Sequence, residues 1–192
     1  MKQPFEQVEV TTRSQWRDWL AAHHTRTESI WLVTYKANTS QPRVPWDDLV
    51  EEALAFGWID SLPRKLDDER TMLLMSPRKP GSNWSGVNKA RIEKMTAAGL
   101  MHPAGLAKIE QAKADGSWAA LDAVDRLEVP ADLEAAFDNR PGAAAAFEGF
   151  PPSTRRGILE WIGNAKRLET RAKRIMETAD RAARGERANQ WR

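Results

Sequence analysis

The stretch from Ala55 to Lys65, AFGWIDSLPRK, places an acid after an apolar run and two cations shortly beyond it. Asp60 could act as a general base if its pKa is raised, or as a charged anchor at the floor of a pocket walled by Trp58. Alternatively, Asp60 caps the end of an apolar helix or pairs with a nearby cation, as acids at element ends often do. The stretch by itself leaves both interpretations open.

Arg64 follows in an expected strand, where alternation places it on the same side as Leu62 and Leu66. An inward charge on an edge strand protects that edge from aggregation. The planar fork of donors on an arginine can equally hold a bound anion.

The most distinctive stretch is residues 76–94, SPRKPGSNWSGVNKARIEK. Prolines on both sides restrict the backbone of Arg78 and Lys79. Trp84 precedes an expected helix N-terminus, whose free amides favour anions, and Asn88 and Arg91 share one face of that helix. Cations beside an exposed aromatic ring can bind phosphate and stack a base. In the alternative interpretation, Trp84 fills the core and the loop only closes over the sheet.

These observations predict a pocket between a helix ending near residue 58, the hairpin that follows it and the 76–91 loop. The tryptophans would form the walls, the cations would hold an anionic small molecule, and the acid would position it. The expected ligand-binding residues are Trp58, Asp60, Arg64, Arg78, Lys79, Trp84, Asn88 and Arg91.

Several kinds of chemistry find no support in the sequence. Cysteine is absent, and the three histidines lack metal-ligand spacing. There is no G-x-S-x-G, P-loop or dinucleotide motif, so we expect no metal, no cofactor and no catalytic residue. Pairs of acids such as Asp47-Asp48 and Glu51-Glu52 fall where caps and turns explain them. The remaining enzymatic alternative is Asp60 or Glu69 as a general base.

The net charge of +2 conceals two basic blocks. Residues 76–113 carry seven cations and two acids, and residues 155–192 carry eleven cations and five acids. Such blocks can bind nucleic acid or anionic membranes, or pair with the acidic segments between them. Acids interrupt the second block, which favours a solvated surface. Nucleic-acid binding is therefore an alternative to binding an anionic small molecule.

The pattern of apolar residues predicts an α+β fold. Residues 5–10 and 29–36 are expected strands, and Thr12-Arg13-Ser14-Gln15 has the form of a capping box that opens a helix. A helix from Pro45 to about Trp58 and a hairpin with an acidic turn at Asp67–Glu69 follow. From Pro77 onward the pattern is helical, with Ser85 capping the first helix.

We expect one domain: a small, largely antiparallel sheet with helices over residues 1–76, and a mainly helical region at 77–185 packed on it. Residues 186–192 are expected to be a frayed tail. No apolar run approaches the ~20 residues that span a bilayer, and the N-terminus lacks the apolar core of a signal peptide. These features predict a cytoplasmic protein without a transmembrane segment. They do not indicate its oligomeric state.

Three stretches together resemble a known family: FGWIDSLPRKLDDER, the long block from SPRKPGSNWSGVNKARIEK to ADGSW, and PPSTRRGILEWIGNAKRLETRAKRI. They are similar to the YdeI/OmpD-associated family, also called bacteriocin-protection proteins, over about residues 28–184. The resemblance implies a link to envelope stress or to bacteriocin resistance. It implies no established reaction, cofactor or catalytic residue, so the expected function is a non-enzymatic stress or resistance protein.

Overall fold

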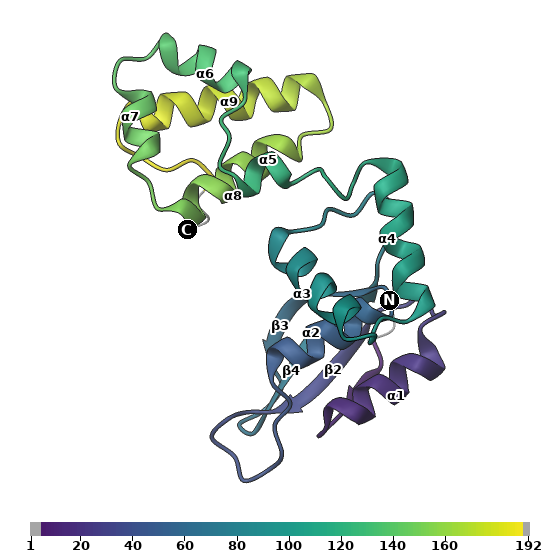
Figure 1. Ribbon diagram of the computed structural model, residues 1–192. Helices are drawn as coiled ribbons and strands as arrows, with labels where there is room; N and C mark the ends of the chain where they lie inside the picture. Colours follow the sequence, from purple (N-terminus) through teal and green to yellow (C-terminus); the bar gives the residue numbers. More distant parts are fainter. Residues whose placement is uncertain (1–4, 190–192) are drawn as a thin grey trace. The chain divides into compact units, whose positions relative to one another are not determined.

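The structure is a computed structural model that describes residues 5–189. The chain forms two compact units that divide between Ala120 and Leu121 (Figure 1). The helical region expected at 77–185 is therefore shared between the two units. That these helices form a single domain with the sheet stays a prediction.

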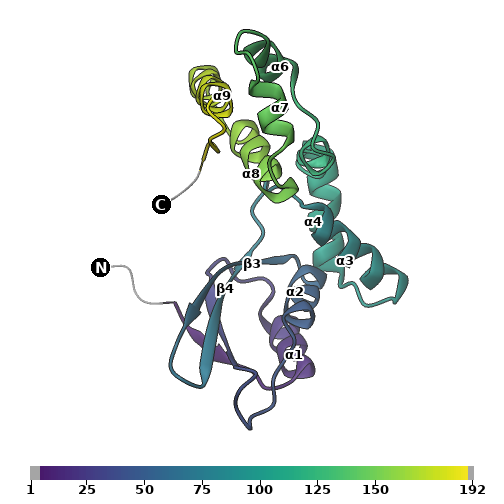
Figure 2. The ribbon, with the colours of Figure 1, turned by 90° about the vertical axis from the view of Figure 1, so that its left-hand side faces the viewer.

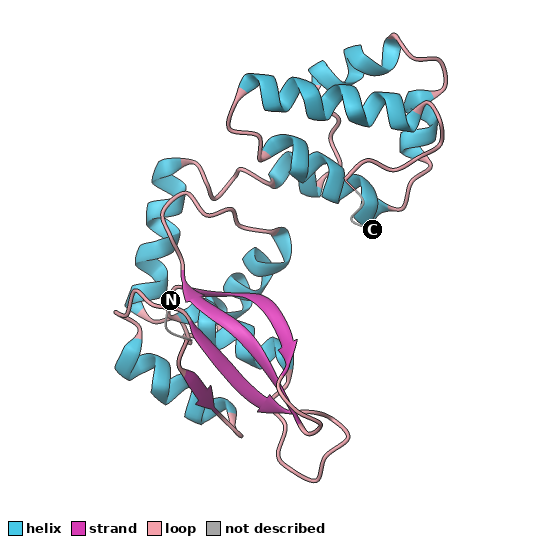
Figure 3. Ribbon diagram, turned by 180° about the vertical axis from the view of Figure 1, so that it is seen from behind, coloured by secondary structure: helices cyan, strands magenta, loops and turns pink. Residues whose placement is uncertain are grey.

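The N-terminal unit contains a four-stranded sheet in the order β1-β2-β4-β3 (Figure 3). Its strands are β1 (Gln7–Glu9), β2 (Ile30–Tyr35), β3 (Trp58–Lys65) and β4 (Arg70–Pro77). β1 runs parallel to β2, and the other two pairings are antiparallel. The predicted α+β class and the largely antiparallel sheet are confirmed.

Four helices belong to this unit: α1 (Arg13–His23), α2 (Trp46–Ala55), α3 (Gly86–Ala97) and α4 (Pro103–Asp115). Helices α1 and α2 lie on one face of the sheet (Figure 2). The predicted capping box opens α1, because Thr12 Oγ1 accepts from the backbone N–H of Gln15 and the Gln15 side chain accepts from that of Thr12. Ser85 caps α3 through its Oγ, which accepts from the backbone N–H of Asn88.

The helix expected to reach Trp58 ends three residues earlier, at Ala55. Gly57 has a φ of +79°, which reverses the chain, and Trp58 then begins β3. The prediction was wrong here because a short, continuous apolar run looks the same in a buried helix and in a buried strand. β3 lies at the edge of the sheet, where Pro63, which has no backbone N–H to donate, is tolerated.

The turn Ala55–Gly57 is also where α4 crosses α2. The backbone N–H of His102 donates to the Ala55 carbonyl oxygen at 3.1 Å, and that of Arg78 donates to the Gly57 oxygen at 2.9 Å. A Cβ placed on Gly105 would lie 2.2 Å from the Ala55 oxygen, so only glycine permits this approach. The loop after β4 and the start of α4 are thereby fixed against one turn.

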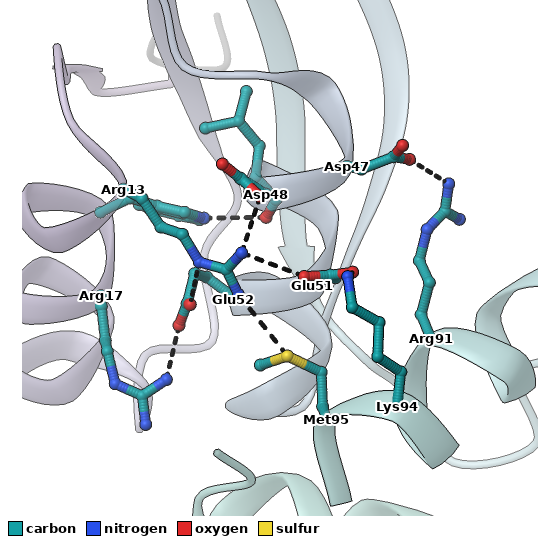
Figure 4. Close-up of polar contacts among 11 residues, drawn as sticks. Arg13, Arg17, Asp47, Asp48, Glu51, Glu52, Arg91, Lys94 and Met95 are labelled. Carbon is teal, nitrogen blue, oxygen red and sulfur yellow. Dashed lines mark hydrogen bonds and ion pairs between the residues drawn. The ribbon is translucent and has the colours of Figure 1, made fainter. Parts of the chain in front are cut away.

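An ion-pair network joins α1, α2 and α3 (Figure 4). Glu51 and Glu52 are buried in the middle of α2, so caps and turns do not explain them as we had expected. Arg13 pairs with both, at 3.0 and 2.6 Å, and with Asp48 at 2.6 Å. Arg17 reaches Glu52 and Lys94 reaches Glu51, at 2.7 and 2.6 Å. Each buried carboxylate therefore has two cationic partners, as burial of a charge requires.

The C-terminal unit consists of helices within the residues described. They are α5 (Asp122–Asp125), α6 (Ala131–Asp138), α7 (Ala143–Glu148), α8 (Pro152–Gly163) and α9 (Leu168–Ala182). Their core includes Leu133, Phe147, Ile158 and Ala179. We expected a frayed tail from residue 186, yet Ala188 is buried in this core. Residues 190–192 of that tail lie outside the described part of the chain.

The contact between α4 and α2 predicts a large effect of a small substitution. Gly105→Ala should lower the free energy of unfolding of the N-terminal unit by at least about 2 kcal/mol, because the new methyl group meets backbone that has no room to move. Gly157→Ala in α8 is the control: a Cβ there meets no atom within 4 Å, so it should be neutral or stabilise by about 0.5–1 kcal/mol. Calorimetric unfolding of both variants measures this, and an unchanged Gly105→Ala transition would contradict the contact.

The network on α2 predicts that Arg13→Met destabilises the protein by about 2 kcal/mol, since it leaves buried carboxylates with fewer partners. Arg126→Met is a matched control, because the Arg126–Glu128 pair is exposed on both sides and should contribute less than about 1 kcal/mol. Urea denaturation compares the two variants. Equal losses would mean that burial of the glutamates does not matter.

Candidate functional site

Both tryptophans of the expected site are buried. Trp58 is in the core between sheet and helices, and its Nε1 donates to the His24 carbonyl oxygen at 3.3 Å. Trp84 packs with Val50, Leu54 and Ile92 in a second cluster, and its ring lies 5.2 Å from that of Trp118. The alternative in which Trp84 fills the core therefore matches its position.

Three of the expected polar residues contact neighbouring side chains of the protein. Arg64 is exposed on β3, with its guanidinium 5.3 Å from the ring centre of Trp31. Arg91 donates to Asn88 Oδ1 at 3.0 Å and pairs with Asp47 at 2.6 Å (Figure 4). The Arg91 guanidinium and the Asn88 side-chain oxygen are thus already engaged with each other.

Asp60 is half-buried on β3 and forms no ion pair within residues 5–189. Burial raises the pKa of its carboxyl group, while its own backbone amide and the charges of Arg91 and Arg78 act in the opposite direction. The expectation that Asp60 holds an arginine by direct contact is not met. Its ionised form is instead disfavoured by desolvation.

Arg78 is the one charged residue of the eight that is buried, with only 4% of its surface exposed. Its guanidinium lies 3.5 Å from the ring centre of Trp84, and Nη1 donates to the Asn83 carbonyl oxygen at 3.0 Å. Nε is buried and has no hydrogen-bond partner among the described residues. Burial lowers the pKa of Arg78 to about 10, opposed by the charge of Asp60, so the group stays charged at neutral pH. This shift corresponds to roughly 3 kcal/mol of disfavoured charge.

Arg78 also lines an open cavity of about 600 Å³, a size typical of small-molecule sites. The walls come from the end of α1, the turn after α2, the loop after β4 and the start of α4. The lining residues are His24, Thr25, Arg26, Thr27, Phe56, Gly57, Pro77, Arg78, Lys79, Pro80, Ala104 and Lys108. No acid lines this cavity within the described chain, so its electrostatic character is cationic with apolar patches.

The arginines and lysines at this cavity differ in their ion pairing. Arg78, Lys79 and Lys108 form no ion pair within the described residues, whereas Arg26 pairs with Glu6 at 2.7 Å. A second space next to Arg78, of about 10 Å³, has room for about one water and includes Asp115 and Ser117 in its lining. Only the larger space can take an organic ligand.

Two of the eight expected residues, Arg78 and Lys79, line this cavity. The sequence did not suggest His24, Arg26, Phe56 or Lys108, because they come from three separate segments that meet only in the fold. The proline-flanked pair Arg78-Lys79 was the one local signal that indicated the right place. That any of these residues contacts a ligand stays a prediction.

Four arginines of the basic block at 155–192 pair with acids of their own unit. Arg156 pairs with Asp125 and Glu160, and Arg171 holds Asp132 through two hydrogen bonds of 2.6 and 2.9 Å. Further pairs join Arg181 to Glu177 and Arg184 to Glu186. These contacts neutralise part of the positive charge of this block.

Three further features of the described residues concern Glu69, metal binding and membrane crossing. Glu69, the second candidate base, is exposed in the turn between β3 and β4. No group of three or more histidine or acidic side chains among residues 5–189 is placed to hold a metal ion. None of the helices in this range combines the length and apolarity that a membrane crossing requires.

The two units match two different protein families. Residues 8–108 match the family described as "Domain of unknown function (DUF8412)", and residues 126–185 match "Bacteriocin-protection, YdeI or OmpD-Associated". The expected resemblance to YdeI/OmpD-associated proteins is thereby confirmed, over residues 126–185. The search found no similar curated protein and no similar solved structure.

The raised pKa of Asp60 predicts a pH-dependent effect of Asp60→Asn. The folded protein holds this proton more tightly than the unfolded chain, so ionisation costs stability at pH 7 and the cost disappears as the pH falls below the ordinary aspartate value. The variant should raise Tm at pH 7 by about 1–3 °C and change it little near pH 3.5. Thermal unfolding measures both. Asp68→Asn, at an exposed acid, should leave Tm nearly unchanged at either pH.

Proposed function

We propose that this chain, which belongs to the DUF8412 family, is a non-enzymatic binding protein whose N-terminal unit takes up an organic anion at the Arg78 cavity. The observation that carries the proposal is Arg78, a buried arginine that lines an open cavity with no acid among its lining residues. Burial of a charge without an ionic partner costs free energy, and an anion bound in the cavity would offset part of that cost.

The form of the ligand follows from the cavity lining. Lys79 and Lys108 add positive charge, while Phe56, Pro77, Pro80 and Ala104 contribute apolar surface. An inorganic anion would leave this apolar surface uncovered. The ligand best suited to it carries an anionic group for Arg78 and an apolar body for the remaining walls.

The biological role we propose is protection against bacteriocins or a related stress. It is supported by the match of the C-terminal unit to the bacteriocin-protection family. The anion would act as a signal or as a molecule to be sequestered, and neither role needs a catalytic residue.

Binding of benzenesulfonate, measured by calorimetry at low salt, tests the proposal. It should bind more tightly than inorganic phosphate, which lacks the apolar body, and more tightly than the neutral benzamide. Arg78→Met should weaken binding at least about tenfold, the usual value of one hydrogen bond to a charged group. Arg64→Met removes an exposed cation away from this cavity and should leave binding unchanged.

Thermal unfolding first establishes that Arg78→Met is folded. Should it not fold, the double variant Lys79→Gln/Lys108→Gln, which changes only the cations without ion pairs, should weaken binding about tenfold. Equal binding of benzenesulfonate and benzamide, or a folded Arg78→Met with unchanged affinity, would contradict the proposal. An Arg64→Met variant that loses binding would instead favour a site on the sheet.

A further inference from the structure

His24 is a titratable group at the wall of the Arg78 cavity, and the proposed function leaves it unexplained. It directly follows α1 and is half-buried. The hydrogen bond from Trp58 Nε1 to its carbonyl oxygen holds the backbone in place. Its ring lies 4.8 Å from the ring of His102 and 6.0 Å from that of Phe56.

The hydrogen bonds of the two histidines determine which of them can take up a proton. Nδ1 of His24 lies 3.1 Å from the Ala21 carbonyl oxygen. Because a carbonyl oxygen only accepts, this nitrogen carries a hydrogen and Nε2 is the basic site. A proton can therefore be added to His24 without loss of a hydrogen bond.

His102 has the opposite arrangement. Its Nδ1 accepts from the backbone N–H of Ala104 at 3.2 Å and caps the N-terminus of α4. A proton on that nitrogen would remove the cap. Burial lowers the pKa of His102, and the charges of His24 and Arg17 lower it further. Of the pair, His24 is the histidine to which a proton can be added without the loss of a hydrogen bond.

Most of the charged groups around His24 are cations. Arg26 lies in the same segment, Arg17 is on α1, and His102 and Lys108 come from the start of α4. Arg78 and Lys79 come from the loop after β4, and Glu6, paired with Arg26, is the acid on this side. An anion bound among these cations reduces their repulsion of a proton on His24.

We propose that the cavity takes up its anion together with a proton, which is carried by Nε2 of His24. The inference rests on the proposed anion site and adds a regulation to it: affinity increases as the pH falls. By linkage, the bound anion in turn favours the protonated histidine.

Calorimetric titration with benzenesulfonate from pH 5.5 to 8 tests this, because the probe stays fully ionised and any pH effect belongs to the protein. The dissociation constant should fall about three- to tenfold from pH 8 to pH 5.5, the effect of one added charge at several ångströms. Titration in buffers of different ionisation enthalpy should show proton uptake on binding.

Two asparagine variants separate the histidines. His24→Asn keeps a donor near the Ala21 oxygen but cannot titrate, so its affinity should not depend on pH. His102→Asn keeps an acceptor for the Ala104 N–H and should retain the dependence. The outcomes distinguish failure of the two proposals. Absence of binding at every pH would remove the anion site itself. Binding that does not change with pH, or that stays pH-dependent in His24→Asn, overturns the proton coupling alone.

Discussion

The backbone contact between Gly105 and the Ala55 carbonyl is the constraint on which the N-terminal unit depends. It brings α4 onto the turn that joins α2 to β3, where a side chain on either Gly105 or Gly57 would meet atoms of the other segment. The same turn accepts the backbone N–H groups of His102 and Arg78. Four segments distant in sequence therefore converge at one place, and the cavity forms along their junction.

The two sides of this junction differ in how their charges are paired. On the α2 side, the buried glutamates take up Arg13, Arg17 and Lys94 in ion pairs. On the cavity side, no acid is among the described lining residues, and Arg78 is held by a carbonyl and by the face of Trp84. Buried charges are normally compensated, so the incomplete compensation of Arg78 separates it from the structural arginines.

In the proposed scheme, the two units have different roles. The N-terminal unit contains the cationic cavity, while the C-terminal unit matches the bacteriocin-protection family and pairs most of its arginines internally. Acids on neighbouring helices and within the segment itself therefore neutralise part of the positive charge of the second basic block.

Local patterns in the sequence determined the capping box at Thr12, the strand at 30–35, the hairpin with its acidic turn and the start of α3 at Ser85, because each depends on neighbours a few residues away. They also singled out Arg78 and Lys79 between prolines. Tertiary structure alone decided that α2 ends at Ala55, that Glu51 and Glu52 are buried against cations of other helices, and that His24 and Lys108 join Arg78 at one cavity. Burial and the meeting of distant segments depend on how elements pack, and no pattern within a single element records that packing.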